Sequence, residues 1–307
     1  EEIQRIADRI TVLRDGCAVA TVDAAQTDLD QVIRWMVGRD LVASEPQARR
    51  ERGDWAMRVD GLCRGPSVRQ VSFDLHRGEI LGFAGLMGSG RTETMRAIFG
   101  ADRPEAGRVF LAGSNTPTPI RSPHDAVRHG IALLTEDRKT HGLLLSQPVR
   151  VNITLNRLED LAGPVGRIRR GEESAVANRL ADLLSIRCSS VEQRADELSG
   201  GNQQKTIMAR WIYRDCDILI FDEPTRGIDV GAKFEIYQLL SDLAGRGKAV
   251  IMVSSDLKEL LGACDRIAVM SAGRLVRTFA REQFDRDEIM AAALSGHVGK
   301  RAEGAKL

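Results

Sequence analysis

A glycine-rich loop directly after an apolar strand is the feature that most restricts the fold of this chain. The strand is EILGFA at 79–84, and the loop that follows is GLMGSGRT. Its spacing matches the phosphate-loop pattern G-x-x-x-x-G-K-[ST], except that arginine replaces lysine. Glycines let successive N–H groups face an anion, toward which the following helix also directs its positive end. We therefore predict contacts to nucleotide phosphates from Gly85, Gly88, Ser89, Gly90, Arg91, Thr92 and Glu93.

Two adjacent carboxylates end a second apolar strand. Asp222 and Glu223 follow the run DILIF at 217–221. At the exit of a strand the pair can diverge, Asp222 toward a Mg²⁺ ion shared with Thr92 and Glu223 toward a water that attacks the γ-phosphate. Such a pair alone is usually a solvated turn, but in one unit with a phosphate loop it is the expected partner. Asp229, just beyond, is predicted to touch an opposing subunit.

The segment LSGGNQQK at 198–205 directly precedes a predicted helix with the sequence TIMARWIYRD. A serine hydroxyl, two glycines with bare N–H groups and the positive end of the helix dipole together make an anion site. A simple helix N-cap is the alternative interpretation. The predicted contacts come from Leu198, Ser199, Gly200, Gly201, Asn202 and Gln203.

The order of strand and helix patterns predicts the fold class. From residue 56 onward, short apolar strands, beginning with AMRVDGL and VSFDL, alternate with amphipathic helical patterns. This alternation is typical of an α/β domain with a largely parallel central sheet. The segments RVFLAG and RLVRT have the pattern of antiparallel edge strands. Between about 148 and 200 helical patterns replace strand patterns, which indicates a helical insertion.

The chain also contains an internal repeat. Residues 1–20 match residues 258–277 at an offset of 257, with Asp8-Arg9-Ile10 on Asp265-Arg266-Ile267 and Glu2 on Glu259. Chance similarity between two pieces of the same secondary structure is the alternative. If the repeat is real, residues 1–42 close a first domain, the polar stretch 43–55 is a linker, 56–300 form a second copy and 301–307 are a tail.

Composition excludes several other classes of protein. Lys and Arg total 44 against 43 Asp and Glu, a balance that gives no support to nucleic-acid binding, so no nucleic-acid partner is expected. No apolar run approaches the ~18–20 residues that span a bilayer. The five cysteines lack any C-x-x-C pair, which is typical of reduced thiols in a cytosolic protein. The start, EEIQRIADRI, lacks the features of a signal peptide.

The chain resembles the ATP-binding-cassette (ABC) ATPases over about residues 57–295. The resemblance rests on three motifs in the order of that family: the phosphate loop, L-S-G-G and D-E-P-T. The resemblance implies a RecA-like P-loop NTPase core with an antiparallel β edge and an inserted helical subdomain. It also implies a head-to-tail pair of cassettes that encloses two ATP molecules, bound with Mg²⁺. LSGGNQQK, GLMGSGRTE and TEDRK (135–139) further resemble the second cassette of tandem subunits from bacterial simple-sugar importers of the ribose, galactoside and xylose type.

Three positions depart from the general cassette pattern. Arg91 replaces the loop lysine, Glu136 stands where a glutamine is usual, and Ser255 stands where a histidine senses the γ-phosphate. A guanidinium is not equivalent to a lysine ammonium, and a serine cannot become cationic. By resemblance Glu136 is nevertheless expected to contact nucleotide and Mg²⁺, and Ser255 and Glu223 to be catalytic. We expect hydrolysis by this chain alone to be weak, while Ser199 and Gly201 complete the ATP site of a first cassette.

The resemblance also implies partners and a location. We expect a membrane permease, contacted by Glu136 and the loop through about Gln147, a first cassette in the same protein, and indirectly a periplasmic sugar-binding protein. The location would be the cytoplasmic face of the bacterial inner membrane. Import of nucleosides or another small polar solute, a soluble ABC ATPase without a permease, and a nucleotide-binding module without turnover remain open.

Overall fold

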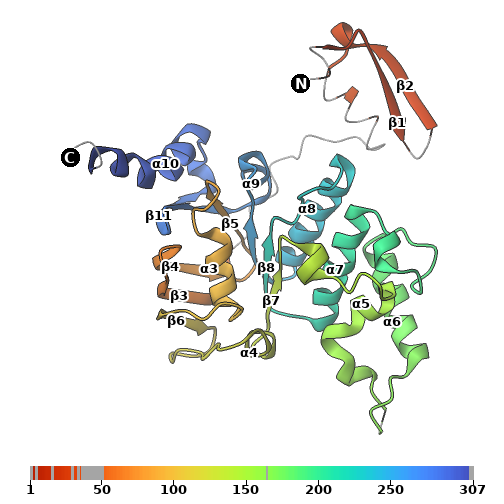
Figure 1. Ribbon diagram of the computed structural model, residues 1–307, viewed down its shortest axis with the longest axis horizontal. Coiled ribbons are helices and arrows are strands. Elements are labelled where there is room, and N and C mark those ends of the chain that lie inside the picture. Colours follow the sequence, from red (N-terminus) through yellow and green to blue (C-terminus); the bar gives the residue numbers. More distant parts are fainter. Residues whose placement is uncertain are drawn as a thin grey trace.

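The computed structural model describes residues 3, 6–14, 17–28, 31, 32, 35, 52–163 and 165–303, and Figure 1 shows an α/β body and a small β-hairpin unit within them. Residues 43–51 of the predicted linker and 304–307 of the predicted tail lie outside the described residues. Among the described helices, none combines the length and the apolar character needed to cross a membrane.

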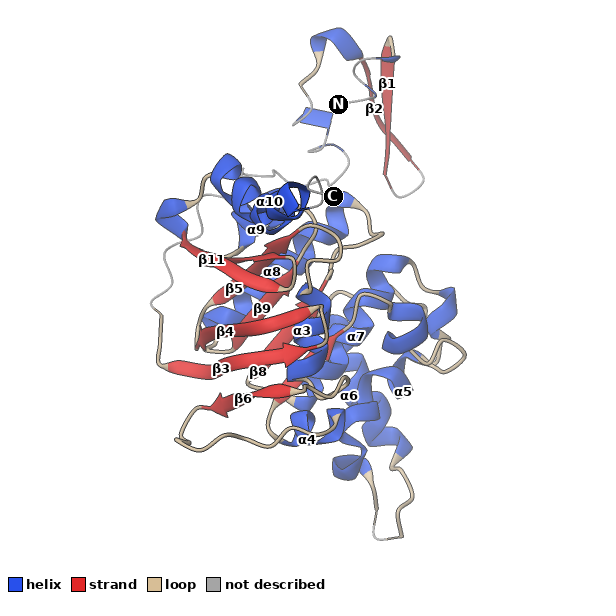
Figure 2. Ribbon diagram, turned by 60° about the vertical axis from the view of Figure 1, so that its left-hand side comes forward, coloured by secondary structure: helices blue, strands red, loops and turns tan. Residues whose placement is uncertain are grey.

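A six-stranded sheet forms the centre of the body (Figure 2). Its strand order is β11-β10-β5-β9-β8-β7, and only β11 pairs antiparallel. The residues of β8 and β9 are all buried, as expected for central parallel strands covered on both faces. This confirms the predicted parallel sheet and its antiparallel edge at RLVRT. The strands are β5 (Ile80–Gly85), β7 (Ile131–Leu134), β8 (Ile218–Asp222), β9 (Ala249–Val253), β10 (Arg266–Ser271) and β11 (Arg274–Ala280).

A second, antiparallel sheet has the order β4-β3-β6, with β3 at Trp55–Arg64, β4 at Val68–His76 and β6 at Ala106–Leu111. The strand pattern did not assign β3 and β4 to a sheet, whereas the antiparallel edge position of RVFLAG, which overlaps β6, is confirmed. Only residues 65–67 separate β3 from β4, and a parallel crossover needs about a dozen residues. In β4, buried positions alternate with more exposed ones, the pattern of an antiparallel strand with one covered face.

Helix α3 (Arg91–Ile98) links the two sheets, because it contacts β3 and β4 as well as β5 and β8. The rings of Phe73 on β4 and Phe83 on β5 also meet edge to face, with centroids 5.1 Å apart. The antiparallel sheet therefore packs against the same helix that begins at the phosphate loop.

The helical insertion is confirmed. Over 148–200 the described residues form helices and turns, and their only β pairings are isolated bridges. Figure 1 shows these helices gathered beside α7, at one side of the parallel sheet. The helices are α4 (Pro123–Arg128), α5 (Val149–Thr154), α6 (Arg170–Leu183), α7 (Gly200–Arg214), α8 (Val230–Gly245), α9 (Leu257–Ala263) and α10 (Arg286–Glu303); shorter turns are η2 (Arg138–Gly142), η3 (Leu155–Leu161), η4 (Ala195–Glu197) and η5 (Arg281–Gln283).

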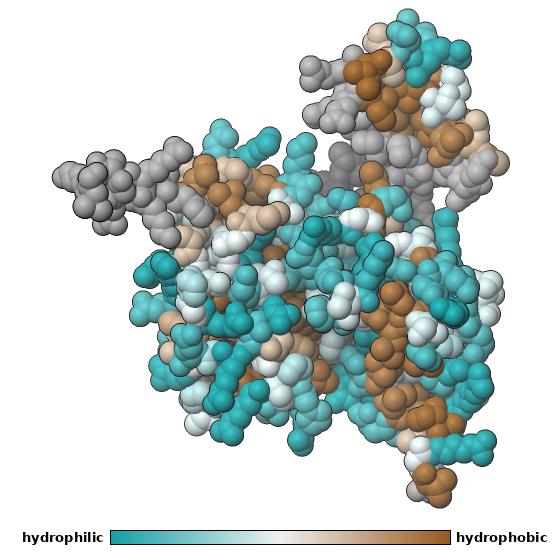
Figure 3. Space-filling view, viewed as in Figure 1, coloured by the Kyte–Doolittle hydropathy of each residue, from teal (hydrophilic) through white to brown (hydrophobic). Residues whose placement is uncertain are grey.

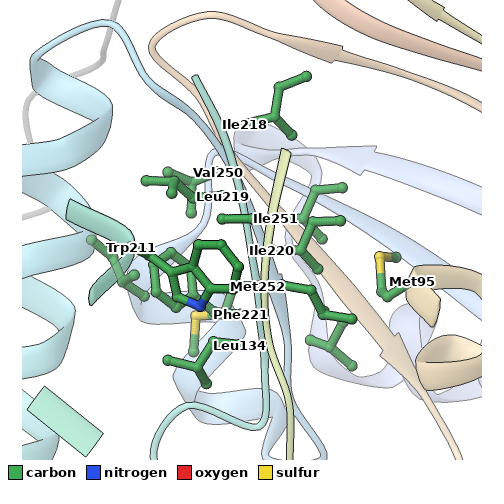
Figure 4. Packing of buried hydrophobic residues seen from close by; sticks show 14 of the residues in the cluster. Met95, Leu134, Trp211, Ile218, Leu219, Ile220, Phe221, Val250, Ile251 and Met252 are labelled. Carbon is green, nitrogen blue, oxygen red and sulfur yellow. The ribbon is translucent and has the colours of Figure 1, made fainter. Parts of the chain in front are cut away.

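The main core lies on both faces of the parallel sheet. Along β8, Phe221 points toward Trp211 of α7 and Ile220 points toward Met95 of α3 (Figure 4). Neighbouring side chains of a strand alternate between faces, so one strand anchors helices on opposite sides. The strand that ends in Asp222 is thereby fixed from both faces.

The hairpin unit repeats the backbone of β10 and β11. Strands β1 (Arg9–Arg14) and β2 (Cys17–Asp23) pair antiparallel, and each residue pair corresponds to a pair in β10–β11 at the offset of 257. Both registers shift at the same step, between Val12 and Leu13 and between Val269 and Met270. The turn η1 (Ala24–Gln26) follows β2 as η5 follows β11. This shared irregularity adds to the residue matches between the two hairpins.

Candidate nucleotide-binding site

The phosphate loop connects β5 to α3, as predicted. Gly90 precedes α3 with φ 96°, and a Cβ atom there would lie 2.0 Å from the carbonyl oxygen of Ser67. Only glycine fits this left-handed and crowded position. No side chain caps the start of α3, whose first N–H groups carry the positive end of the helix dipole. Glu93 lies in this first turn, on the helix side of the loop.

Ser89 lies inside the loop with 1% of its surface exposed. Among the described residues, its Oγ is the one buried side-chain polar atom without a hydrogen-bond partner. A Cβ atom placed on Gly85 would come within 2.5 Å of this hydroxyl, so the two residues meet across the loop. A buried polar group without a partner costs free energy, and a polar ligand at the loop would relieve that cost.

Thr92 and Asp222 are brought together from α3 and β8. The Thr92 hydroxyl donates to Asp222 Oδ1 at 3.2 Å, and Asp222 is 2% exposed. Burial raises the pKa of Asp222 to about 6, although the hydrogen bond from Thr92 opposes this rise. A hydroxyl and a carboxylate are suitable ligands for Mg²⁺, which usually takes one or two carboxylates and completes its shell with water and phosphate oxygens.

Glu223 leaves β8 in a left-handed conformation, with φ 50°. Its N–H donates to the carbonyl oxygen of Val253 at 2.9 Å, which ties the end of β8 to the end of β9. The hydroxyl of Ser255 donates to Glu223 Oε2 at 3.1 Å. Burial raises the pKa of Glu223, while Arg91 and the hydrogen bonds from Ser255 act in the opposite direction. Ser255 therefore reaches the predicted catalytic carboxylate, even though it is shorter than a histidine.

The side chain of Arg91 extends toward the ends of β8 and β9. Its Nη1 donates to the carbonyl oxygen of Ser254 at 2.5 Å, and its Nη2 lies 3.9 Å from Glu223 Oε1. The side chain is buried, and burial lowers the pKa of Arg91 against the opposing effect of Glu223 and Asp222. The contact of this guanidinium with β- and γ-phosphates stays a prediction, because its contacts in the structure are with protein oxygens.

Glu136 follows β7 and forms an ion pair with Arg226. Its described contacts are thus with the loop after Glu223 rather than with Thr92 or Asp222, and its role toward nucleotide or Mg²⁺ stays a prediction. Two residues later, Arg138 Nη1 donates to the carbonyl oxygen of Arg226 at 2.9 Å. The 136–138 segment and the turn at Arg226 and Gly227 are therefore held to each other by one ion pair and two hydrogen bonds.

The LSGG segment forms the start of α7. Leu198 is buried, Ser199 is the N-cap residue, and Gly200 begins the helix. The Ser199 hydroxyl accepts from Asn202 Nδ2 at 2.9 Å and does not cap the helix backbone, so the simple N-cap alternative is not supported. Gln203 donates to the carbonyl oxygen of Ala195 and is buried.

Helices α7 and α8 approach closely at their N-terminal ends. A Cβ atom on Gly201 would lie 2.8 Å from the Cβ of Ala232, so glycine is required at this contact. Asp229, predicted to touch an opposing subunit, caps α8 by accepting from the N–H of Ala232 at 2.9 Å. The capping contact is local and leaves the predicted subunit contact untested.

Sequence reasoning missed one buried polar cluster beside this site. Glu259 on α9 accepts hydrogen bonds from Thr225 and Ser254, which lie beside Glu223 and Ser255 in the sequence. The only signal in the sequence was the match between Glu259 and Glu2 in the repeat. A buried glutamate cannot be distinguished from an exposed one by its position in a short amphipathic helix.

A glycine-rich turn between β5 and α3, with Thr92 against Asp222 at the end of a buried parallel strand, defines a P-loop nucleotide-binding protein. A family model described as "ABC transporter" matches residues 68–226, just over half of the chain, and the chain belongs to this family. Its fold is that of the ABC ATPases. One similar structure is a nucleotide-free ATP-binding cassette from an ABC transporter, with TM-score 0.65 and 18% identity over 77% of this chain and 95% of that one. Another is a dimeric post-hydrolysis state of a cassette bound to ADP and Pi, with TM-score 0.61 and 20% identity over 74% of this chain and 100% of that one.

Curated relatives have much higher identity. A ribose/galactose/methyl galactoside import ATP-binding protein of Burkholderia cenocepacia (strain HI2424) is 50% identical over 291 residues, which cover 94% of this chain and 56% of that protein. The ribose import ATP-binding protein RbsA 3 of Rubrobacter xylanophilus is 46% identical over 293 residues, which cover 95% of this chain and 58% of that protein. The chain therefore spans little more than half the length of these relatives.

Proposed function

We propose that this chain is the ATP-binding, energy-coupling part of a bacterial ABC importer for a simple sugar of the ribose or galactose type. The observation that carries this proposal is the meeting of Thr92 and Asp222 at a phosphate loop, in a chain 50% identical to a protein named for sugar import. ATP binding would close two cassettes on each other and move the helices of a permease.

The residues present fit a nucleotide with Mg²⁺. The Gly85–Thr92 backbone would hold the phosphates, and the unpaired Ser89 hydroxyl would gain a partner there. Thr92 and Asp222 would ligate the metal ion, with Glu136 as a further proposed contact. Bound Mg²⁺ would polarise phosphoryl oxygens. Glu223 would orient and deprotonate a water, helped by the hydroxyl of Ser255.

We further propose that the longer protein carries two cassettes, with residues 1–42 closing the first, 43–55 linking, 56–300 forming the second and 301–307 ending as a tail. Support comes from side chains exposed in the hairpin unit whose counterparts are buried in the body. Leu13 is 67% exposed and Ile6 is 85% exposed, whereas Met270 is fully buried and Ala263 is 4% exposed. Strand β10 also pairs with β5, and a first cassette would supply the same parallel neighbour to β1.

The proposed head-to-tail pairing assigns the start of α7 to the ATP of the first cassette. Ser199 and Gly201 would face that triphosphate, with Asp229 at the interface between cassettes. The Ser199 hydroxyl is not used to cap α7, which leaves the N–H groups of the first turn available for an anion. The site at Arg91 would then hold nucleotide and turn over slowly, because the guanidinium lies against the carboxylate of Glu223.

Partners and location follow from the same proposal. Glu136 and the loop through Gln147 would contact the permease, and the exposed side chain of Leu144 in this loop offers an apolar contact. Figure 3 shows apolar side chains gathered over the helices on that side of the body. The subunit would lie on the cytoplasmic face of the inner membrane and couple indirectly to a periplasmic sugar-binding protein. The net charge of +1 favours no nucleic-acid partner.

Purification in detergent tests this function. The longer protein, produced with the membrane proteins encoded beside its gene, should copurify with a permease. Its ATPase rate in vesicles should rise with a sugar-loaded binding protein, and Ser199→Arg, at the start of α7, is the matched low-activity control. A rise only with a nucleoside-loaded protein would correct the substrate class. Failure to copurify, with hydrolysis stimulated by RNA or ribosomes instead, would replace the proposal with a non-transport ATPase.

A further inference from the structure

Two loops carry the groups proposed for hydrolysis. Glu223 lies two residues before Thr225 in the loop after β8, and Ser255 follows Ser254 in the loop after β9. Both Thr225 and Ser254 are 2% exposed. Their hydroxyls point to the same acceptor, the carboxylate of Glu259 on α9.

The contacts of Glu259 join the two loops directly. Thr225 Oγ1 lies 2.8 Å from Glu259 Oε1 and 2.7 Å from Oε2, and Ser254 Oγ donates to Oε2 at 2.8 Å. The carbonyl oxygen of Ser254 accepts from Arg91 on its other side. Ser254 is therefore held by its side chain and by its backbone, immediately before the residue that donates to Glu223.

Glu259 keeps its charge in this buried position. Lys233 Nζ on α8 donates to Glu259 Oε1 at 2.8 Å, and the Tyr237 hydroxyl from the same helix also hydrogen-bonds to it. Burial alone would raise the pKa of Glu259, but the hydrogen bonds from Lys233, Thr225, Ser254 and Tyr237 outweigh it and hold the pKa below its usual value. A carboxylate with two oxygens can accept from all of these donors at once, whereas a neutral amide cannot.

We infer that Glu259 is a positioning residue for ATP hydrolysis, which holds the Glu223 loop and the Ser255 loop in register through the hydroxyls of Thr225 and Ser254. This inference rests on the hydrolytic role proposed for Glu223. The proposed role requires no contact of Glu259 with nucleotide or water. It acts by fixing the backbone on each side of the Ser255–Glu223 hydrogen bond.

The helical subdomain contains a matched control for a purely structural role. There Glu173 is 3% exposed, accepts from the Thr154 hydroxyl at 3.0 Å and pairs with Arg150 at 2.5 Å. It has the same chemistry, a buried glutamate with a threonine donor and a cation, but lies in α6 rather than beside Glu223. Loss of either cluster should cost stability, and only one should affect hydrolysis.

The experiment compares Glu259→Gln and Thr225→Val with Glu173→Gln and Thr154→Val in the whole chain. Single-turnover ATP hydrolysis with protein in excess, at a series of protein concentrations, gives the rate at saturating protein and the half-saturating protein concentration. Amide hydrogen exchange measures loops 223–226 and 253–256. Glu259→Gln and Thr225→Val should reduce the rate about tenfold or more, equal to about 1.4 kcal/mol of barrier. They should leave the half-saturating protein concentration within about twofold of the wild-type value. They should also speed amide hydrogen exchange in both loops.

The control variants should lower the melting temperature without changing the rate or the exchange of these loops. Equal rate losses in both sets would make Glu259 merely structural and overturn the inference. So would loosened loops with an unchanged rate, or unchanged exchange in the Glu259→Gln variant. Hydrolysis by the wild-type chain that does not depend on Glu223 would instead remove the proposed function, and is recognised separately by its persistence in Glu223→Gln.

Discussion

Arg91 and Glu223 face each other, with guanidinium and carboxylate atoms 3.9 Å apart. The same guanidinium also donates to the carbonyl oxygen of Ser254. The substitution of the usual loop lysine therefore places a cation on the carboxylate proposed to activate water. An ion pair of this kind lowers the basicity of the carboxylate and restrains its movement.

Arg91→Lys should increase hydrolysis by this site. A lysine ammonium cannot make the guanidinium's contacts with Ser254 and Glu223 together, so it releases Glu223 and becomes available to phosphates. We expect the single-turnover rate to rise about tenfold, a change of about 1.4 kcal/mol in the barrier. Arg96→Lys is the control, because Arg96 lies on the same helix but pairs with Asp102. A lower or unchanged rate for Arg91→Lys contradicts this explanation of the slow site.

Ser199→Arg should harm the longer protein more than Arg91→Ala. An arginine at the start of α7 would block the approach of a triphosphate from the proposed first cassette, whereas loss of Arg91 would affect only the site proposed to be slower. We expect the steady-state ATPase rate to fall at least about tenfold for Ser199→Arg, which corresponds to about 1.4 kcal/mol or more. Ser295→Arg, at an exposed position on α10, controls for the added charge. The reverse order of losses would exchange the roles of the two sites.

Asp222→Asn should stabilise the chain at pH 7.5 in the absence of Mg²⁺. The folded pKa of Asp222 is about 6 against an ordinary value of 3.8, so its ionisation opposes folding as the pH rises through this window. The gain approaches at most about 3 kcal/mol above pH 6, shrinks as the pH falls, and is lost below about pH 4, where both states are protonated. Urea unfolding at pH 7.5 and 4.5 measures the difference in the free energy of unfolding between Asp222→Asn and the parent chain.

Asp217, directly before the start of β8, provides a control for which the change in stability should have the opposite sign. Burial would raise its pKa, but hydrogen bonds and charge from Lys248 and Arg77 lower it. Asp217→Asn should therefore destabilise the chain at neutral pH and lose its effect as the pH falls. Destabilisation by Asp222→Asn at pH 7.5 would show that its ionised form is stabilised by contacts that outweigh burial.

Equivalent positions in the two hairpins should respond differently to the same change. Met270→Ser removes a fully buried side chain and should cost about 2–5 kcal/mol in urea unfolding of the chain. Leu13→Ser, at the corresponding position, is 67% exposed and should change this value by no more than about 0.5 kcal/mol. In the longer protein Leu13→Ser should become destabilising as well. No effect there would contradict a first cassette that covers β1.

The central sheet and the meeting of Thr92 with Asp222 could be predicted because their physical signals are local. The apolar runs of β5, β8 and β9 are long enough to identify buried parallel strands, and the phosphate-loop spacing fixes Thr92 at the start of α3. The sheet membership of β3 was not predicted, because an apolar strand pattern alone does not specify the partner of a strand. The short 65–67 connection was the available signal against a parallel arrangement.

The contacts of long charged side chains were beyond prediction. Nothing in the sequence indicates that Arg91 turns toward Ser254, or that Glu136 pairs with Arg226, because both contacts join elements far apart in the chain. Glu259 was missed for a similar reason, since its donors come from the ends of two different strands and from α8. Side chains with several rotatable bonds depend on the assembled tertiary structure for their final direction.

The common register shift gives the two hairpins the same strand pairing. A chimera in which residues 9–26 replace residues 266–283 would need no change in segment length, because the strand pairs correspond one to one and shift register at the same step. A difference in the free energy of unfolding between that chimera and the parent chain would then measure how well the transplanted side chains fit the core that receives them.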